Sequence, residues 1–249
     1  EYIDHSGSDL MVANAARTSF GKESTWDSVD GECVLKATDA KLINFLASGY
    51  RTEEWKDMLQ EVKDLAALGN DDLLSLFLRG FKRKAQHWAP FGHPHLTLRM
   101  TLPLFLARQF VKHQIGGTWS EESRRYMSSE PSFWFPDKWH TRPADIKQGS
   151  GDTVQHEGYV EDISLTTTET ALLAYSQLLE AGVAPEEART VLTLNAMTTV
   201  TWTGSLLFWA RVRNQRVDAH AQLAAQELGR KFDEIVGPRY PVSWAALTT

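Results

Sequence analysis

The chain has 249 residues, of which 42% are hydrophobic and 23% are charged, and its formal net charge is -6. This length and composition are typical of a folded protein with a large core. The net negative charge disfavours a nucleic-acid coat or a protein that binds anionic membranes, although a local basic patch could still hold one anionic small molecule.

The cysteine and apolar content indicate the compartment. A single cysteine, Cys33, excludes an internal disulfide and suits a reducing environment, so the cytoplasm is the expected location. No stretch approaches the roughly 18 continuous apolar residues of a membrane span, and residues 1–10 lack the basic-then-apolar layout of a signal peptide. We therefore expect no membrane-bound partner.

The N-terminal third is predicted to be helical. Residues Ser6–Phe20 have apolar side chains at helical spacing, with Ser8 or Asp9 as the cap. Further helices are expected from Lys41 onward, over Glu53–Leu68 with Gly69 as its stop, and over Asp71–Phe81.

At His93 the periodicity changes from helix to strand. Leu96, Leu98 and Met100 alternate with polar residues, which predicts a half-buried strand. Pro103 suits the first turn of a following helix, expected to run to Gln114 and to be ended by glycines at 116 and 117.

The stretch Arg108–Tyr126 is too polar for a buried element and predicts a surface that meets a charged ligand. Beyond it, residues 131–160 show no clear period, and helices are expected over 164–181, 185–192 and 205–216. Residues 198–202 have the character of a strand or of a helix start, and Asp218 is predicted to cap a closing helix over Asp218–Val236. No linker divides the chain, so we expect one catalytic domain over residues 1–249.

Three polar clusters are candidates for chemistry: residues 87–95, 108–126 and 211–222. The histidines of the first cluster are poor metal ligands, because prolines interrupt the segment and no metal-binding spacing is present, so no metal site is expected. Arginines such as Arg124, Arg125 and Arg216 suit a phosphate, since guanidinium donates paired hydrogen bonds; a solvated basic face is the alternative for each. Ser123 lies in no nucleophile-elbow motif, so we expect it to hydrogen-bond a substrate.

The clusters, in this order, resemble the flavin-dependent thymidylate synthases. That family has a signature of the form RHR-x2-S-x-N-E-x-S-x-R-Y, and its second half corresponds to Ser120, Glu121, Ser123, Arg125 and Tyr126. In the first half, Lys112-His113-Gln114 stands where Arg-His-Arg is usual. The resemblance extends to residues 13–20, 41–46, 87–93, 186–192 and 216–222, and residues 52–83 correspond to a helical insertion.

The resemblance implies an α/β fold (α+β) in which helices flank a curved, mainly antiparallel sheet, assembled as a homotetramer with shared active sites. It implies reductive methylation of dUMP to dTMP with FAD as cofactor and methylenetetrahydrofolate and NADPH as co-substrates. Arg216 and Ser123 would be catalytic. The residues expected to bind dUMP are Gln109, Glu121, Ser123, Arg124, Arg125, Arg189 and Arg216, and those expected to approach FAD are His87, Lys112, His113, Gln114, Ser120, Glu121 and Arg211.

The departures from the family pattern lie on the flavin side. Positions where the family usually offers Asn, Arg and Asn to the flavin correspond to Ser205, Leu207 and Arg211. Two alternatives therefore stay open: a flavin- and folate-dependent pyrimidine deoxynucleotide hydroxymethylase on the same scaffold, and a non-catalytic homologue that binds dUMP.

Overall fold

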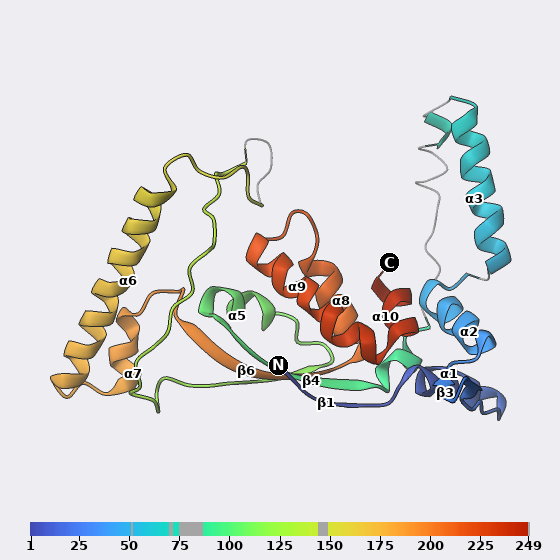
Figure 1. Cartoon of the computed structure of the whole chain (residues 1–249), viewed down its shortest axis with the longest axis horizontal. Helices are drawn as coiled ribbons and strands as arrows, with labels where there is room; N and C mark the ends of the chain where they lie inside the picture. The colour runs from blue at the N-terminus through green and yellow to red at the C-terminus, as the bar shows by residue number, and fades with distance from the viewer. Residues whose placement is uncertain (51, 70–71, 75–86, 144–148, 249) are drawn as a thin grey trace. The chain divides into compact units, whose positions relative to one another are not determined.

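A computed structural model describes residues 1–50, 52–69, 72–74, 87–143 and 149–248 (Figure 1). The expected helix over Asp71–Phe81 lies mostly outside the described residues, as does part of the insertion over 52–83. The chain folds into two compact units. The first comprises Glu1–Asp4, Leu96–Gly204 and Arg211–Glu234, and the second comprises His5–His95, Ser205–Ala210 and Ile235–Thr249. The prediction of a single catalytic domain stays a prediction.

The main element of the first unit is a four-stranded sheet. Its strands are β1 (Tyr2–Ser6), β4 (His95–Pro103), β6 (Met197–Ser205) and β5 (Gly117–Glu121), in the order β1-β4-β6-β5. β5 and β6 are antiparallel, with Trp119 opposite Trp202. The threonine hydroxyl pairs 97 with 203 and 101 with 199 join β4 to β6 in an antiparallel sense, at 2.9 and 3.3 Å.

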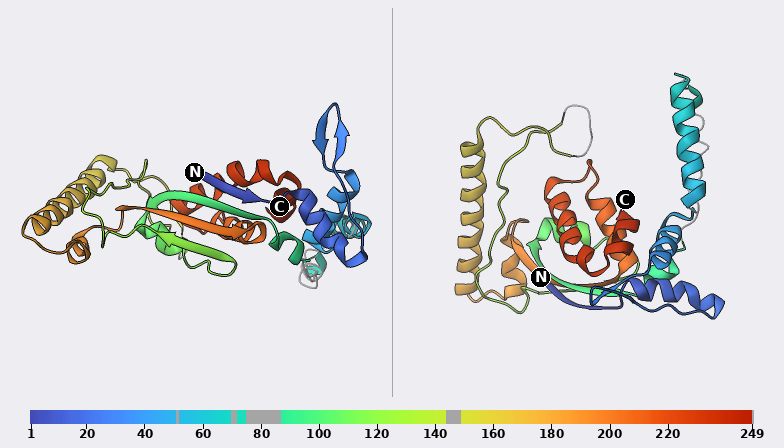
Figure 2. Two further views of the ribbon diagram at one scale, coloured as in Figure 1. Left: turned by 90° about the horizontal axis from the view of Figure 1, so that it is seen from below. Right: turned by 45° about the vertical axis from the view of Figure 1, so that its right-hand side comes forward.

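The two central strands, β4 and β6, each have one buried face and one more exposed face. On β4, Leu96, Leu98, Met100 and Leu102 are buried, as the alternation in the sequence predicts. The α-helices α5 (Leu104–Phe110) and α9 (Leu223–Val236) cover this face, because the Phe110 ring packs edge-on against Trp202 and Phe232 at centroid distances of 6.3 and 6.2 Å. Figure 2, left, shows the strands from the side opposite to α5 and α9.

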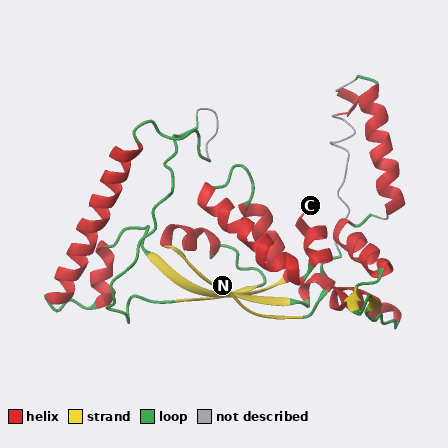
Figure 3. Cartoon of the chain, in the orientation of Figure 1, coloured by secondary structure: helices red, strands yellow, loops and turns green. Residues whose placement is uncertain are grey.

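After β5, the first unit continues with a segment that is mostly loop and then with a long helix. Residues 122–143 and 149–156 run mostly as loop (Figure 3) beside α6 (Glu157–Glu180). The Tyr175 hydroxyl of α6 donates to the Met127 carbonyl at 3.4 Å, and the Asn195 side chain donates to the Trp134 carbonyl at 3.0 Å. After α6 come α7 (Pro185–Ala188) and the short 3-10 helix η3 (Arg189–Val191).

The second unit is a helical cluster. It contains α1 (Asp9–Arg17), η1 (Thr18–Phe20), α2 (Ala37–Ser48), α3 (Thr52–Ala67), η2 (Ala89–Gly92), η4 (Gly237–Arg239) and α10 (Pro241–Thr248), with a hairpin of β2 (Asp27–Val29) and β3 (Glu32–Val34). The buried Asp9 carboxylate accepts the Val242 and Ser243 amides at 2.9 Å each, which caps α10 from a distant helix. The helix α8 (Leu206–Arg216) is divided between the two units.

The expected elements are largely confirmed. Ser8 caps α1, β4 is a strand, Gly69 follows α3, and residues 198–202 belong to a strand rather than to a helix start. The fold class is confirmed as helices flanking an antiparallel sheet. Several boundaries are wrong. The α6 helix begins at Glu157 instead of Ser164, α7 ends at Ala188 and is followed by η3, α5 ends at Phe110 instead of Gln114, and α9 begins at Leu223 instead of Asp218. Asp218 accepts the His220 amide at 2.8 Å in a local turn, so its capping group serves the turn before the helix.

Within the described part of the chain, the structure contains no helix that is both apolar and long enough to cross a bilayer.

Candidate active site

The polar stretch of residues 108–126 folds as a helix end, a turn and a strand. Gly116 has a positive φ of 87°, which turns the chain from α5 into β5. The α5 helix ends at Phe110, and pairing of β5 with β6 begins at Gly117, so residues 112–114 lie between the two elements. Lys112, His113 and Gln114 therefore lie in the turn between α5 and β5, at the edge of the buried face of the sheet.

The turn brings His113 to Arg216, at the end of α8. The Arg216 Nε donates to His113 Nε2 at 3.0 Å, and its Nη2 donates to the Gln109 carbonyl at 2.6 Å. The guanidinium carbon lies 5.2 Å from the centroid of the Phe110 ring, within cation–π range. We refer to Gln109, Phe110, His113, Arg216 and Gln222 as the Arg216 cluster.

The electrostatics of this cluster keep His113 neutral. Burial lowers the pKa of His113, and the positive charge of Arg216 lowers it further, to about 4. Burial also lowers the pKa of Arg216, yet a guanidinium remains charged at neutral pH. At pH 7 the cluster therefore presents one cation beside one uncharged imidazole.

Gln222 joins the cluster from the turn before α9. The Gln109 amide nitrogen donates to the Gln222 side-chain oxygen at 2.6 Å. In the sequence, Gln222 lies in the polar stretch of residues 211–222 without an assigned role, and Phe110 has no polar group that would mark it as a site residue. Their proximity to Arg216 depends on the packing of α5 against α9, for which sequence spacing holds no signal.

The second half of the polar stretch, residues 120–126, forms what we call the Ser120–Tyr126 strip. The Glu121 carboxylate accepts from the Thr198 hydroxyl at 3.0 Å and from the Trp119 indole at 3.1 Å, so both of its oxygens are engaged. The Arg125 Nε donates to Ser123 Oγ at 3.0 Å, and the Arg125 guanidinium lies 5.0 Å from the Tyr126 ring centroid. These contacts hold Ser123 and Arg125 together at the end of β5.

Arg124 lies within the strip, and Arg189 lies at the start of η3. Both are predicted to bind dUMP, and each makes its own local contacts. The Arg124 Nη1 donates to the Ser129 carbonyl at 2.8 Å, while its Nε is buried without a hydrogen-bond partner among the described residues. The Arg189 Nε donates to the Glu186 carbonyl at 3.2 Å on the exposed surface after α7. Both side chains keep further N–H groups for a ligand.

The sequence-predicted residues thus fall into separate groups. Gln109, His113 and Arg216 meet in one cluster, and Ser123 and Arg125 meet in the strip. Within the described residues, no hydrogen bond or ion pair joins the side chains of Lys112, Gln114, Ser120 or Arg211 to either group. All four of these residues are exposed.

The three positions that depart from the family pattern have clear local environments. The Ser205 hydroxyl accepts the Phe208 amide at 3.2 Å and so caps α8, and Leu207 is buried at 5% exposure. Ser205 keeps its O–H donor beside this capping bond, whereas Leu207 has no polar group to offer a ligand. Arg213, the neighbour of Arg211 by two residues, is paired with Asp233 through bonds of 2.9 to 3.1 Å.

His87 lines a cavity of about 700 Å³ in the second unit, here called the His87 cavity. The His87 ring lies 5.4 Å from the Phe45 ring at an angle of 34°. The lining combines small and aliphatic residues with aromatic and cationic ones, which include Phe20, Trp88, His93, Arg17 and Lys22. Flat walls and cations are the features that a planar ring with phosphates requires, so the residues present fit part of a flavin or of another planar cofactor.

Arg17 in this cavity is held by a buried carboxylate. Asp39 has no exposed surface, and it accepts hydrogen bonds from Arg17 Nε at 2.9 Å and from the Ser24 hydroxyl at 2.6 Å. The Asn14 side chain also bonds the Ser24 backbone in both directions. This network fixes the segment between η1 and β2, which carries Lys22.

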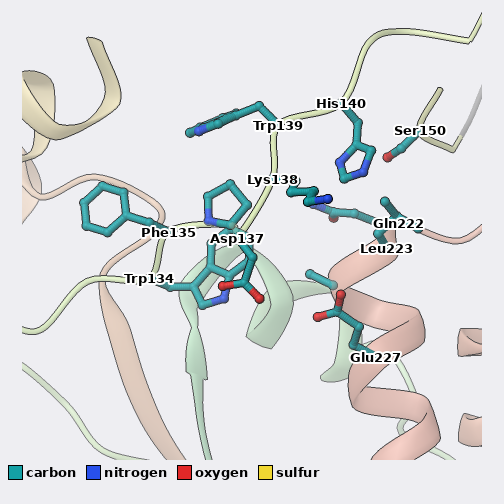
Figure 4. A pocket seen from close by; sticks show the side chains of 12 residues that line it. Trp134, Phe135, Asp137, Lys138, Trp139, His140, Ser150, Gln222, Leu223 and Glu227 are labelled. Carbon is teal, nitrogen blue, oxygen red and sulfur yellow. The ribbon is translucent and has the colours of Figure 1, made fainter. Parts of the chain in front are cut away.

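A second cavity, of about 520 Å³, lies in the first unit beside Gln222 (Figure 4). Trp134, Phe135 and Trp139 form its aromatic wall, and Gln222 and Glu227 face them from the start of α9. Lys138, Asp137 and His140 add charges of both signs. The cavity contains no concentration of cations that would suit a phosphate.

Metal and thiol chemistry have no evident site in the described residues. Within those ranges, no three His, Cys, Asp or Glu side chains gather in a group that could hold a metal ion. Cys33 is exposed on β3, and β3 pairs only with β2 in its two-stranded sheet.

Comparisons with known proteins point to one family. The family model described as "Thymidylate synthase complementing protein" matches residues 1–242. A flavin-dependent thymidylate synthase of Thermosipho africanus is 32% identical over 162 residues, covering 64% of this chain and 71% of that protein. Its counterpart in Ehrlichia ruminantium is 28% identical over 251 aligned residues, covering 98% of this chain and 68% of that protein.

A solved structure shares the fold. The crystal structure of the UMP/dUMP methylase PolB from Streptomyces cacaoi, bound with 5-Br dUMP, aligns with a TM-score of 0.72 at 22% identity. The alignment covers all of this chain and 93% of that one. At this identity the likeness establishes the architecture of the sheet and its helices.

Proposed function

Because this chain belongs to the family of flavin-dependent thymidylate synthases, we propose that it methylates dUMP reductively to dTMP, using FAD, methylenetetrahydrofolate and NADPH. The observation that carries the proposal is the Arg216 cluster, in which a charged guanidinium is held beside a neutral imidazole and a carboxamide. This arrangement suits a uracil ring, which has carbonyl oxygens that accept hydrogen bonds.

Arg216 would make the main electrostatic contribution to catalysis, by stabilising negative charge on the uracil ring. Making C5 of uracil nucleophilic places negative charge on the ring oxygens, and a fixed guanidinium stabilises that charge without reorganising. Gln109, bonded to Gln222, would orient the ring by its remaining amide groups. No side-chain nucleophile is required, because FAD reduced by NADPH supplies the hydride that turns the transferred one-carbon unit into a methyl group.

The Ser120–Tyr126 strip would bind the phosphate of dUMP. Arg125 and Ser123 already lie within hydrogen-bonding distance of each other, and guanidinium forms charge-assisted pairs with phosphate oxygens. Arg124 and Arg189 would add further donors. Glu121, with both oxygens engaged by Thr198 and Trp119, would shape the strip and contribute its remaining lone pairs.

For the flavin we propose two contact regions. His87 and the aromatic walls of its cavity would take a planar portion of the cofactor. The other residues proposed to approach FAD are Lys112, His113, Gln114, Ser120, Glu121 and Arg211. With Leu207 buried and Ser205 engaged as a cap, the protein would hold FAD through fewer polar contacts than its family usually offers.

Assembly as a homotetramer with shared active sites would bring the separate groups together. In support, α6 carries exposed apolar side chains, including Ile163 at 51% and Leu173 at 59%, which a partner subunit could bury. We further propose that the chain acts as one catalytic domain in the cytoplasm, without nucleic acid or membrane as partners, in keeping with its net charge of -6 and its single cysteine.

Product analysis tests this function. The protein is incubated with dUMP, methylenetetrahydrofolate and NADPH, and the nucleotide product is identified by mass spectrometry. We expect dTMP. A product heavier by one oxygen would establish the hydroxymethylase alternative, and a protein that binds dUMP yet shows no flavin bleaching by NADPH would establish the non-catalytic one.

A further inference from the structure

Arg216 has five N–H groups, arranged in a rigid plane. One edge of that plane carries the Nε–H and an Nη2–H, and the end of the plane carries the paired Nη1–H and Nη2–H groups. The Nε–H bonds His113 at 3.0 Å, and Nη2 bonds the Gln109 carbonyl at 2.6 Å. Among the described residues, protein acceptors occupy only the first edge, so the end of the fork is open to a ligand.

The contact with Arg216 determines which nitrogen of the His113 imidazole carries the proton. A guanidinium can only donate, so His113 Nε2 must accept, and an accepting ring nitrogen carries no proton. The single proton of a neutral ring must then sit on Nδ1. The tautomer follows from the chemistry of the partner, without any assumption about hydrogen positions.

We propose that His113 is a positioning residue for Arg216: it accepts the Nε–H and, with the Gln109 carbonyl, sets which edge of the guanidinium meets the pyrimidine. This role deepens the proposed function, on which its catalytic consequence rests. It assigns to His113 a task toward the nucleotide-binding arginine, in addition to the flavin contact that its place in the signature implies.

The physical gain is preorganisation. A free arginine side chain loses rotamer entropy when it is fixed, and a mobile guanidinium stabilises developing charge less well than a fixed one. Three contacts fix this one: the acceptors on His113 and Gln109, and the face of the Phe110 ring at 5.2 Å from the guanidinium carbon. Of these, only the His113 contact reaches Nε, which is the atom that sets the rotation of the plane.

Two substitutions separate positioning from space filling. His113→Gln keeps a side-chain oxygen that can accept from Arg216, whereas His113→Leu fills similar volume but cannot accept. His156, an exposed histidine next to α6, provides the matched control as His156→Leu. Circular dichroism and bound FAD are measured for each variant, so that unfolding or flavin loss is recognised separately.

For dTMP formation we expect His113→Leu to lower kcat roughly ten- to a hundredfold, the usual effect of losing a hydrogen bond to a charged group. His113→Gln should recover most of that loss, and His156→Leu should match the wild type. Equal kcat values for the wild type and His113→Leu would overturn the proposal, as would a His113→Gln variant no better than His113→Leu.

A readout independent of turnover is the nitrogen-15 spectrum of the His113 side chain in the wild-type holoenzyme at pH 7. We expect a neutral ring protonated on Nδ1 only, with Nε2 shifting when Arg216 is replaced by lysine. A ring protonated on Nε2 would contradict the proposal even if dTMP is formed. The expected spectrum, combined with absence of dTMP, would retain the positioning geometry and reject the proposed function instead.

Discussion

The Arg216 cluster and the Ser120–Tyr126 strip differ in how far apart in sequence their partners lie. In the cluster, Arg216 bonds residues 103 and 107 positions away, and Gln109 bonds a residue 113 positions away. In the strip, Arg125 bonds Ser123, two residues before it, and Arg124 bonds Ser129, five residues after it. The cluster is therefore built by the tertiary structure, while Ser123, Arg124 and Arg125 of the strip are organised by their own turn.

This difference predicts a division of labour. Groups fixed by distant packing are suited to stabilising charge in a transition state, since they do not reorganise during the reaction. Groups on a local turn can adjust to an incoming phosphate and contribute mainly to binding. Substitutions in the cluster should thus lower kcat, and substitutions in the strip should raise KM for dUMP.

The largest effect is expected for Arg216→Ala. Removing the guanidinium should lower kcat by about a hundred- to a thousandfold, as for other groups that stabilise developing negative charge. FAD content, measured from the visible spectrum, should change far less. The exposed Arg142→Ala is a matched control and should behave as the wild type. Normal turnover by Arg216→Ala would remove the central role assigned to the cluster.

Arg125→Ala should have the next largest effect. Loss of one charge-assisted bond to the phosphate should raise KM for dUMP about tenfold or more and leave kcat nearly unchanged. Deoxyuridine, which lacks the phosphate, should be used equally poorly by the wild type and by Arg125→Ala. If kcat falls as steeply as with Arg216→Ala, the distinction between the two regions is wrong.

The pH dependence of stability should report on the cluster. The folded-state pKa of His113 is lowered to about 4 by burial and by the charge of Arg216, whereas an unfolded histidine titrates near 6.5. Between these values the unfolded chain binds more protons, so this group makes the free energy of unfolding fall as the pH drops from about 6.5 to about 4.

Melting temperatures at pH 7 and pH 5 measure this contribution. We expect the melting temperature of the wild type to fall more between pH 7 and pH 5 than that of His113→Gln, in which the titrating ring is absent. The exposed His156→Gln is the control and should lose as much as the wild type. An equal loss in His113→Gln would show that His113 is not held neutral by the cluster.

The smallest effect is expected for Cys33→Ala. The thiol is exposed on β3 and belongs to neither region, so turnover should stay within about twofold of the wild type. Abolished activity would mean that a protein nucleophile takes part and that the chemistry is not confined to the two regions compared above.

Local patterns predicted much of the fold. The alternation of Leu96, Leu98 and Met100 indicated β4, and the apolar spacing behind Ser8 indicated α1 with its cap. The predicted boundaries of α5 and α9 were wrong because contacts between distant segments determine where these helices end and begin. The α5 helix stops at Phe110 because β5 must pair with β6, and Asp218 serves a turn because α9 starts only after that turn.

The candidate site divides in the same way. Ser123 and Arg125 could be paired from sequence, because their contact is local. Gln222 and Thr198 could not be assigned, since each reaches its partner, Gln109 or Glu121, only through the packing of separate elements.

The amino-acid sequence by itself determined the family, the chemical class of the ligands and the polar character of residues 108–126, because these depend on residue types at short spacing. Tertiary structure alone decided that the two halves of this stretch differ. The turn at Gly116 and the pairing of β5 with β6 send His113 toward Arg216 and leave Ser123 and Arg125 on a local turn. A hydrogen bond between residues 103 positions apart requires packed elements between them, and no local pattern encodes that distance.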